Sequence, residues 1–192
     1  LTMDYGQKHS IEIEKAKLIA EHFQVIEHKI IEIDLTVFGG SALTDKNINI
    51  PEHESQGIPV TYVPARNTIF FSLALAWAEV IQANSIYSGV NAIDYSGYPD
   101  CRPEYIKAMQ ALVNLATKAT VEGSSIAIEA PLLDMNKMDI IKKGIENNVD
   151  FSKTVSCYQL SKHSKSCGVC DSCRIRLKAF EELNLIDRIE YV

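Results

Sequence analysis

Short apolar runs alternate with amphipathic segments along this chain, and no other feature constrains its fold as strongly. The strand-like runs cover residues 1–5, 28–35, 85–89 and 126–130. Apolar side chains recur at helical spacing in residues 7–23, 67–77, 103–120, 138–145 and from about 174 onward. Strands and helices that alternate at these lengths predict a parallel sheet with helices on both faces. The sequence therefore predicts an α/β fold.

Composition narrows the class of protein further. With 46% hydrophobic residues and a net charge of -6 over 192 residues, the chain is typical of one globular domain with a small appendage, and disorder is excluded. The longest apolar run, residues 69–78, is shorter than the roughly 18 residues that a membrane span needs. The acidic balance argues against a nucleic-acid-binding chain. We expect residues 1–150 to form the main α/β domain, and residues 151–192 to form a small appended segment.

Four cysteines are crowded near the C-terminus. Cys157, Cys167, Cys170 and Cys173 form the pattern C-x9-C-x2-C-x2-C, whose short spacings let loop thiolates converge on one ion. Four sulfur ligands leave no open coordination position, so the pattern predicts a structural zinc ion, with an iron–sulfur cluster as the main rival. Reduced, metal-binding cysteines favour a cytoplasmic location.

Other polar residues follow the predicted strands or begin the predicted helices. Arg66 stands at a helix start, where the helix dipole and its own charge favour an anion, although a helix cap beside a surface arginine explains the pattern equally well. Lys137 lies in the first turn of a helix that follows a strand. Loops after Tyr5, Gly89 and Ala130 are expected at the carboxyl ends of the strands, where α/β proteins bind ligands.

Several segments, taken in order, resemble the 7-cyano-7-deazaguanine synthase family of queuosine biosynthesis. They are DYGQKHS at 4–10, GGSALTD at 39–45, GIPVTYVPARN at 57–67, GVNAIDYSGYPDCR at 89–102 and the four-cysteine segment. The combination of SGYPDCR with a downstream CGxCxxC is specific, whereas each piece alone is not. The likeness spans nearly the whole chain.

The resemblance implies an adenine-nucleotide-binding, Rossmann-like domain of the ATP-pyrophosphatase class. It also implies an ATP-dependent ligase that uses Mg²⁺ and converts 7-carboxy-7-deazaguanine and ammonia to 7-cyano-7-deazaguanine. By this likeness Arg66, Lys137 and Asp100 are the candidate catalytic residues. The nucleotide is expected at Tyr5, Gly6, Gln7, Arg66, Gly89 and Lys137, and the deazapurine at Asp94, Tyr98 and Asp100.

One departure from the family separates this chain from its relatives. The family carries a Ser-Gly-Gly-x-Asp-Ser phosphate loop upstream of the segment that resembles DYGQ, and this sequence contains no such motif. We therefore expect an upstream segment to be absent from the sequence. Apolar helix faces permit a homodimer. Two other functions stay open: another enzyme of the same class that modifies tRNA or transfers an amido group, and a zinc-ribbon RNA-binding module built on the basic residues of 157–178.

Overall fold

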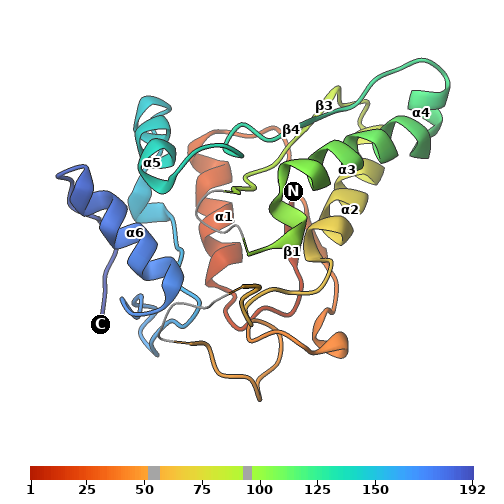
Figure 1. The fold of residues 1–192 in the computed structure, drawn as a ribbon. Helices are drawn as coiled ribbons and strands as arrows, with labels where there is room; N and C mark the ends of the chain where they lie inside the picture. The colour runs from red at the N-terminus through yellow and green to blue at the C-terminus, as the bar shows by residue number, and fades with distance from the viewer. Residues whose placement is uncertain (52–56, 93–96) are drawn as a thin grey trace. The chain divides into compact units, whose positions relative to one another are not determined.

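The computed structural model describes residues 1–51, 57–92 and 97–192 (Figure 1). It confirms an α/β fold with parallel strands. The elements follow one another as β1 (Thr2–Asp4), α1 (Ile11–His22), β2 (Ile30–Glu32), η1 (Thr36–Phe38), α2 (Arg66–Val80), β3 (Ser85–Tyr87), η2 (Pro99–Cys101), α3 (Pro103–Ala116), α4 (Lys118–Val121), β4 (Ala127–Glu129), α5 (Lys137–Glu146), η3 (Phe151–Lys153) and α6 (Asp171–Glu182). Within the part of the chain that the structure describes, every helix is too short or too polar to cross a membrane.

The chain forms two compact units. The first joins Leu1–Pro64 to Lys137–Val192, and the second is the intervening segment Ala65–Asn136. Compactness and function need not divide a chain at the same residue. The predicted functional boundary near residue 150 therefore stays a prediction.

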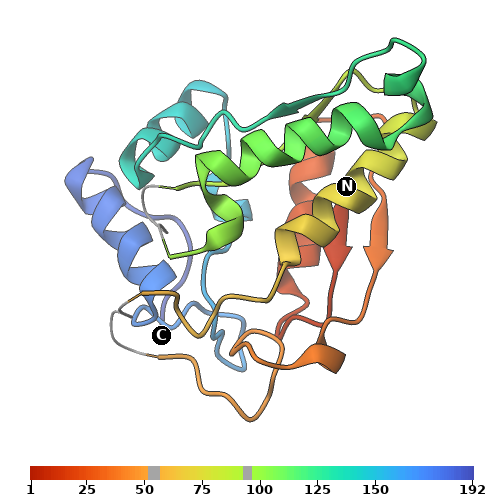
Figure 2. The same ribbon diagram turned by 45° about the vertical axis from the view of Figure 1, so that its right-hand side comes forward.

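In the first unit, α1 connects the two strands of a parallel pair, and Figure 2 shows β1 and β2 side by side. Met3 lies opposite Ile31, and the backbone N–H of Leu35 extends the ladder by donating to the carbonyl of Tyr5 at 3.2 Å. Helices α5 and α6 pack through a core of Ile141, Ala179 and Phe180. The loop after β1 thus begins where both strands end.

In the second unit, α3 and α4 connect another parallel pair, in which Ile86 lies opposite Ile128. The Gln110 side chain of α3 accepts a hydrogen bond from the N–H of Ile128 at 2.7 Å and donates to the carbonyl of Ile126 at 3.0 Å. The Gln110 side chain therefore ties α3 to the backbone of β4 and of the residue before it. Helices α2 and α3 lie side by side in both views (Figures 1 and 2).

Several predicted boundaries are wrong in detail. The helix predicted over 103–120 breaks at Thr117, whose extended backbone separates α3 from α4 and whose hydroxyl accepts the N–H of Thr120 at 3.2 Å. Helix α6 begins at Asp171, three residues before the predicted start, and Cys173 therefore lies in its first turn. Helix α2 is less buried than its apolar sequence predicts, with Phe71, Leu75 and Ala78 as its buried residues.

Candidate functional site

The four predicted metal ligands converge in the first unit. Their sulfur atoms all lie within 4.8 Å of one another, and three of the four residues are buried while Cys167 is partly exposed. The Sγ atoms of Cys167 and Cys173 are 4.0 Å apart. Tetrahedral zinc with Zn–S bonds of about 2.3 Å places its sulfurs roughly 3.8 Å from one another. A metal ion such as zinc therefore fits this cluster, here called the four-cysteine site.

Local backbone geometry explains how short spacings bring these thiols together. Gly168 adopts a φ of +75° and turns the chain directly after Cys167. Cys170 is the N-cap of α6, and Cys173 follows it in the first helical turn. The turn and the helix start thus point three sulfurs at one position, while Cys157 arrives from a separate segment.

Backbone amides and the crowded thiols prepare the site for a cation. The Sγ of Cys157 accepts the N–H groups of Gln159 and Cys167, each at 3.2 Å. The hydrogen bond with Cys170 raises the pKa of Cys157 to about 11, and the same contact lowers the pKa of the Cys170 thiol. Several adjacent thiolates repel one another unless a cation neutralises them, so metal binding must release protons here. A set of four soft sulfur donors suits a closed, structural site.

The predicted nucleotide segment, Tyr5 to Gln7, lies at the end of β1 in the same unit. The backbone N–H of Tyr5 donates to the Gln7 side chain at 2.8 Å, and the Tyr5 side chain is buried. Gly6 adopts a φ of +78°, and a Cβ placed on it would lie 2.5 Å from Cγ2 of Thr36. Only glycine fits this turn without a shift of its neighbours.

A histidine that the sequence analysis did not select joins this segment to the cysteine loop. Nε2 of His9 accepts the N–H of Leu160 at 3.1 Å. Burial lowers the pKa of His9, and the neutral imidazole can act as this acceptor. Because Leu160 follows Cys157 by three residues, the contact anchors the segment after Cys157 beside the DYGQKHS segment. A sequence pattern contains no signal for a contact between residues so far apart.

In the second unit, the structure brings Arg66 and Asp100 to the start of α2. The Asp100 carboxylate accepts the backbone N–H of Asn67 at 2.9 Å, and the Asn67 side chain donates to the Asp100 carbonyl at 2.9 Å. The N-cap residue of α2 is Ala65, which lies in the left-handed region at φ 53° and makes no side-chain hydrogen bond to the helix. The capping group comes instead from the PDCR segment.

The remaining candidates belong to both units. Tyr98 is buried and its carbonyl accepts the N–H of Cys101 at 3.1 Å, while Lys137 opens α5 in the first unit. Gly89 follows β3, and a Cβ placed on it meets nothing within 4 Å. Asp94 lies outside the described residues. In the described part of the loop after β3, the N–H of Ala92 donates to the carbonyl of Leu133 at 3.0 Å. The loops after β3 and β4 therefore meet at the carboxyl ends of these two strands.

Four of the five basic residues in 157–178 form ion pairs with carboxylates. The pairs are Lys165–Glu190, Arg174–Asp171, Arg176–Asp187 and Lys178–Glu182. A surface that binds the phosphates of RNA needs cations whose charge is available to phosphate. This pairing weighs against the RNA-binding alternative.

Comparison with known proteins finds a matching family and several similar proteins. The family described as "Queuosine biosynthesis protein QueC" matches residues 1–184. A 7-cyano-7-deazaguanine synthase from Methylobacillus flagellatus is 56% identical over 191 residues, which cover 100% of this chain and 83% of that protein. Proteins of the same name from Saccharophagus degradans and Stutzerimonas stutzeri are 54% and 53% identical, and each is covered to 85%. The chain therefore belongs to the queuosine biosynthesis protein QueC family.

Proposed function

We propose that this protein is an ATP-dependent carbon–nitrogen ligase that converts 7-carboxy-7-deazaguanine and ammonia to 7-cyano-7-deazaguanine. The observation that carries this proposal is identity above half, over the full chain, to relatives that bear the synthase name. The start of α2, where a carboxylate from the PDCR segment caps the helix beside Arg66, supports the same conclusion. Both segments belong to the sequence resemblance.

The reaction requires activation because a carboxylate oxygen is a poor leaving group. Transfer of a phosphoryl or adenylyl group from ATP to the carboxylate converts that oxygen into a good leaving group. Ammonia then displaces it and forms an amide, and a second ATP activates the amide oxygen so that it leaves and the nitrile forms. The protein has to bind the phosphates and the acceptor in one orientation and to stabilise the charge that develops.

We assign the phosphates of ATP to the starts of helices α2 and α5. Arg66 is the first residue of α2 and Lys137 the first residue of α5, and a cation at such a position adds to the favourable field of the helix dipole. Mg²⁺ is expected to accompany the phosphates, because it binds nucleotides through phosphate oxygens and few protein ligands. Asp100 contributes by holding the start of α2, and therefore Arg66, in place.

The other ligand contacts follow from the sequence resemblance. Tyr5, Gly6, Gln7 and Gly89 are assigned to the nucleotide, and Asp94, Tyr98 and Asp100 to the deazapurine. Zinc at the four-cysteine site has a structural role, since four sulfurs leave no position for a substrate. A cytoplasmic location, a homodimer and the absence of nucleic-acid binding stay predictions.

The experiment is acceptor-dependent ATP consumption by the full-length gene product. With ammonia and Mg²⁺ present, 7-carboxy-7-deazaguanine should trigger ATP consumption, whereas bulk tRNA should not. Arg66→Met should lower kcat/KM by about 100-fold or more, as expected for loss of one preorganised charge at the phosphates. Lys107→Met, at an exposed position of α3, is the matched control and should leave kcat/KM unchanged. ATP consumption that needs tRNA, or none with either acceptor, would refute the proposal.

A further inference from the structure

The C-terminal tail, residues 185–192, lies beyond the residues that the family matches and contacts the backbone directly before Cys167. The family match ends at residue 184. Farther along the chain, Tyr191 forms a parallel bridge with Ser166: Ser166 donates its N–H to the Glu190 carbonyl at 2.9 Å, and Val192 donates to the Ser166 carbonyl at 3.0 Å. Ser166 immediately precedes Cys167. The tail therefore fixes the backbone next to one metal ligand.

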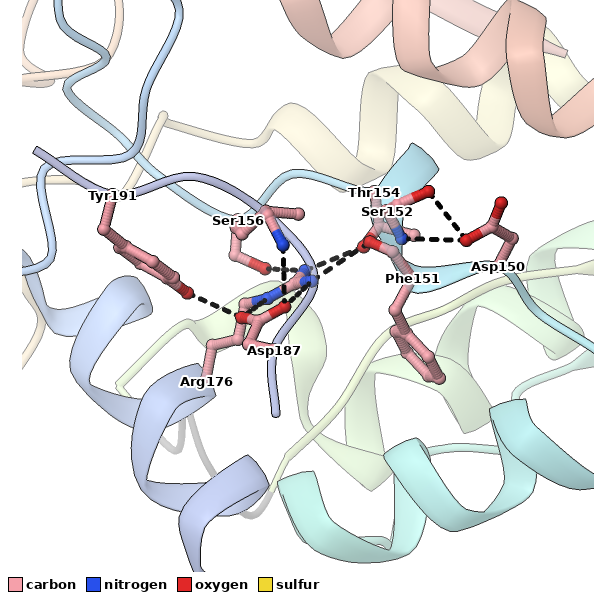
Figure 3. Close-up of polar contacts among 9 residues, drawn as sticks. Asp150, Phe151, Ser152, Thr154, Ser156, Arg176, Asp187 and Tyr191 are labelled. Carbon is pink, nitrogen blue, oxygen red and sulfur yellow. Dashed lines mark hydrogen bonds and ion pairs between the residues drawn. The ribbon is translucent and has the colours of Figure 1, made fainter. Parts of the chain in front are cut away.

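A buried ion pair ties the same tail to the helix that carries Cys173. In Figure 3, Arg176 reaches from α6 to Asp187: its Nε lies 2.6 Å from Oδ2 and its Nη2 lies 2.8 Å from Oδ1. The two side chains are only 5% and 4% exposed. The Tyr191 hydroxyl donates to the same carboxylate at 2.6 Å. Because Arg176 follows Cys173 by three residues, the pair fixes the helical turn that presents this ligand.

The guanidinium also holds the segment that leads to Cys157. Its Nη1 donates to the hydroxyl of Thr154 at 2.8 Å, and its Nη2 donates to the carbonyl of Phe151 at 3.2 Å (Figure 3). The planar group thus links α6, the tail and the 151–156 segment. Each of these three pieces of chain carries or adjoins a metal ligand.

Stability alone does not account for this arrangement. Removing two charges from water costs nearly as much as their attraction returns, and an apolar core of equal volume often stabilises a protein as well. An ion pair with full hydrogen bonding does, however, fix a geometry that apolar packing leaves less defined. Its position between the ligand-bearing segments indicates what that geometry serves.

We propose that Arg176, Asp187 and Tyr191 are positioning residues of the metal centre, here called the C-terminal clamp. The clamp holds the segments of Cys157, Cys167 and Cys173 at coordination distance before the metal binds, and thereby raises the affinity for zinc. This inference rests on the zinc site of the proposed function. The three residues are not metal ligands themselves, but they determine how the four cysteines are presented to the metal.

The test is the zinc affinity of the full-length protein, measured by competition with a chromophoric zinc chelator. Asp187→Asn keeps the shape of the side chain but removes its charge, and should weaken zinc binding about 10-fold to 100-fold, the range typical of residues that orient metal ligands. Tyr191→Phe removes one hydrogen bond and should have a smaller effect in the same direction. Glu182→Gln is the control, because it disrupts the exposed Lys178–Glu182 pair of the same helix and should leave the affinity unchanged.

Two further measurements separate positioning from general stabilisation. The clamp predicts that Asp187→Asn lowers the melting temperature of the zinc-loaded protein more than that of the metal-free protein. It also predicts that the visible spectrum of the Co²⁺-substituted variant departs from that of a regular four-sulfur tetrahedral site. Equal melting losses with unchanged zinc affinity would overturn the proposal. If Asp187→Asn does not fold, unchanged affinity in Tyr191→Phe alone would overturn it.

Failure of the clamp and failure of the proposed function give different results. A wild-type protein that binds zinc, with variants that bind it equally well, refutes the clamp alone. A wild-type protein that binds no zinc removes the metal site on which the clamp depends, while ATP consumption with 7-carboxy-7-deazaguanine still reports on the synthase activity.

Discussion

At the scale of single residues, Gly6 shows how closely the segment after β1 is packed. A side chain there meets both a left-handed backbone, at φ +78°, and Cγ2 of Thr36 at 2.5 Å. Gly40 has nearly the same backbone, at φ +76°, but the nearest atom to its Cβ position is 4.0 Å away. The two glycines therefore separate conformational strain from steric overlap.

We predict that Gly6→Ala is the more destabilising of the two substitutions. Left-handed backbone costs an alanine about 1–2 kcal/mol at either position, and overpacking adds about 1–3 kcal/mol at Gly6 only. Urea denaturation of both variants measures the difference. Equal losses of unfolding free energy would show that Thr36 yields without cost and that the turn is not tightly packed.

Asp187 predicts a pH dependence of stability. Burial raises the pKa of this carboxyl, but hydrogen bonds from Arg176 and Tyr191 and the charge of Arg176 outweigh burial and hold the pKa below its usual value. A carboxyl with a lowered pKa in the folded state stabilises that state above its unfolded pKa of about 3.9. That stabilisation is lost as the pH falls through the folded pKa.

Asp187→Asn should therefore flatten the acid limb of the stability curve. The comparison is made by thermal unfolding of metal-free wild type and variant from neutral to acidic pH, since acid also releases zinc from thiolates. The gap between the two proteins should narrow as the pH drops below about 4. Parallel curves would mean that Asp187 has an ordinary pKa in the folded protein.

At the scale of elements, the start of α2 depends on a residue from a distant loop. The Asp100 carboxylate accepts the N–H of Asn67, one of the helix's first amides. We predict that Asp100→Ala lowers the unfolding free energy by about 1 kcal/mol, as loss of a helix cap commonly does, and raises amide exchange at the first turn of α2. Asp134→Ala, an exposed carboxylate of the same unit, is the control. Unchanged exchange at the first turn would contradict the capping role.

The order of elements could be predicted from the sequence, because hydrophobic periodicity is a local property. All the strands and most of the helices in the described part of the chain occur where apolar spacing predicts them. Helix ends were less accurate, since Thr117 breaks one helix through its own hydroxyl and backbone, a feature that apolar periodicity does not contain. Cysteine spacing predicted the four converging thiols because three of them follow one another at intervals of three residues.

Contacts between distant segments could not be predicted in the same way. Arg176 is one of the basic residues of 157–178 on which the RNA-binding alternative depends, yet its side chain is 5% exposed because its partner arrives from the tail. His9 and Leu160 are likewise separated by most of the chain. Pairings of this kind depend on how helices pack, and a residue's own neighbourhood in sequence does not encode them.

At the scale of the whole molecule, the four-cysteine site connects the two ends of the chain within the first unit. We predict that zinc removal loosens part of this unit before the rest, because the binding free energy of a closed site also contributes to folding. Hydrogen exchange after chelation should rise first in residues 157–173 and should leave the β1–β2 pair protected. Uniform loosening of all described segments would contradict a local structural role for the metal.

Formation of a nitrile from a carboxylate and ammonia is the activity that we propose for this protein. The most direct measurement is mass spectrometry of the product formed by the full-length protein from 7-carboxy-7-deazaguanine, ATP, Mg²⁺ and ¹⁵N-labelled ammonia. We expect 7-cyano-7-deazaguanine that contains one labelled nitrogen and has lost both carboxylate oxygens, and we expect its formation to depend strictly on ATP. Unaltered 7-carboxy-7-deazaguanine, from a protein with its zinc bound and its fold intact, would contradict the proposed activity.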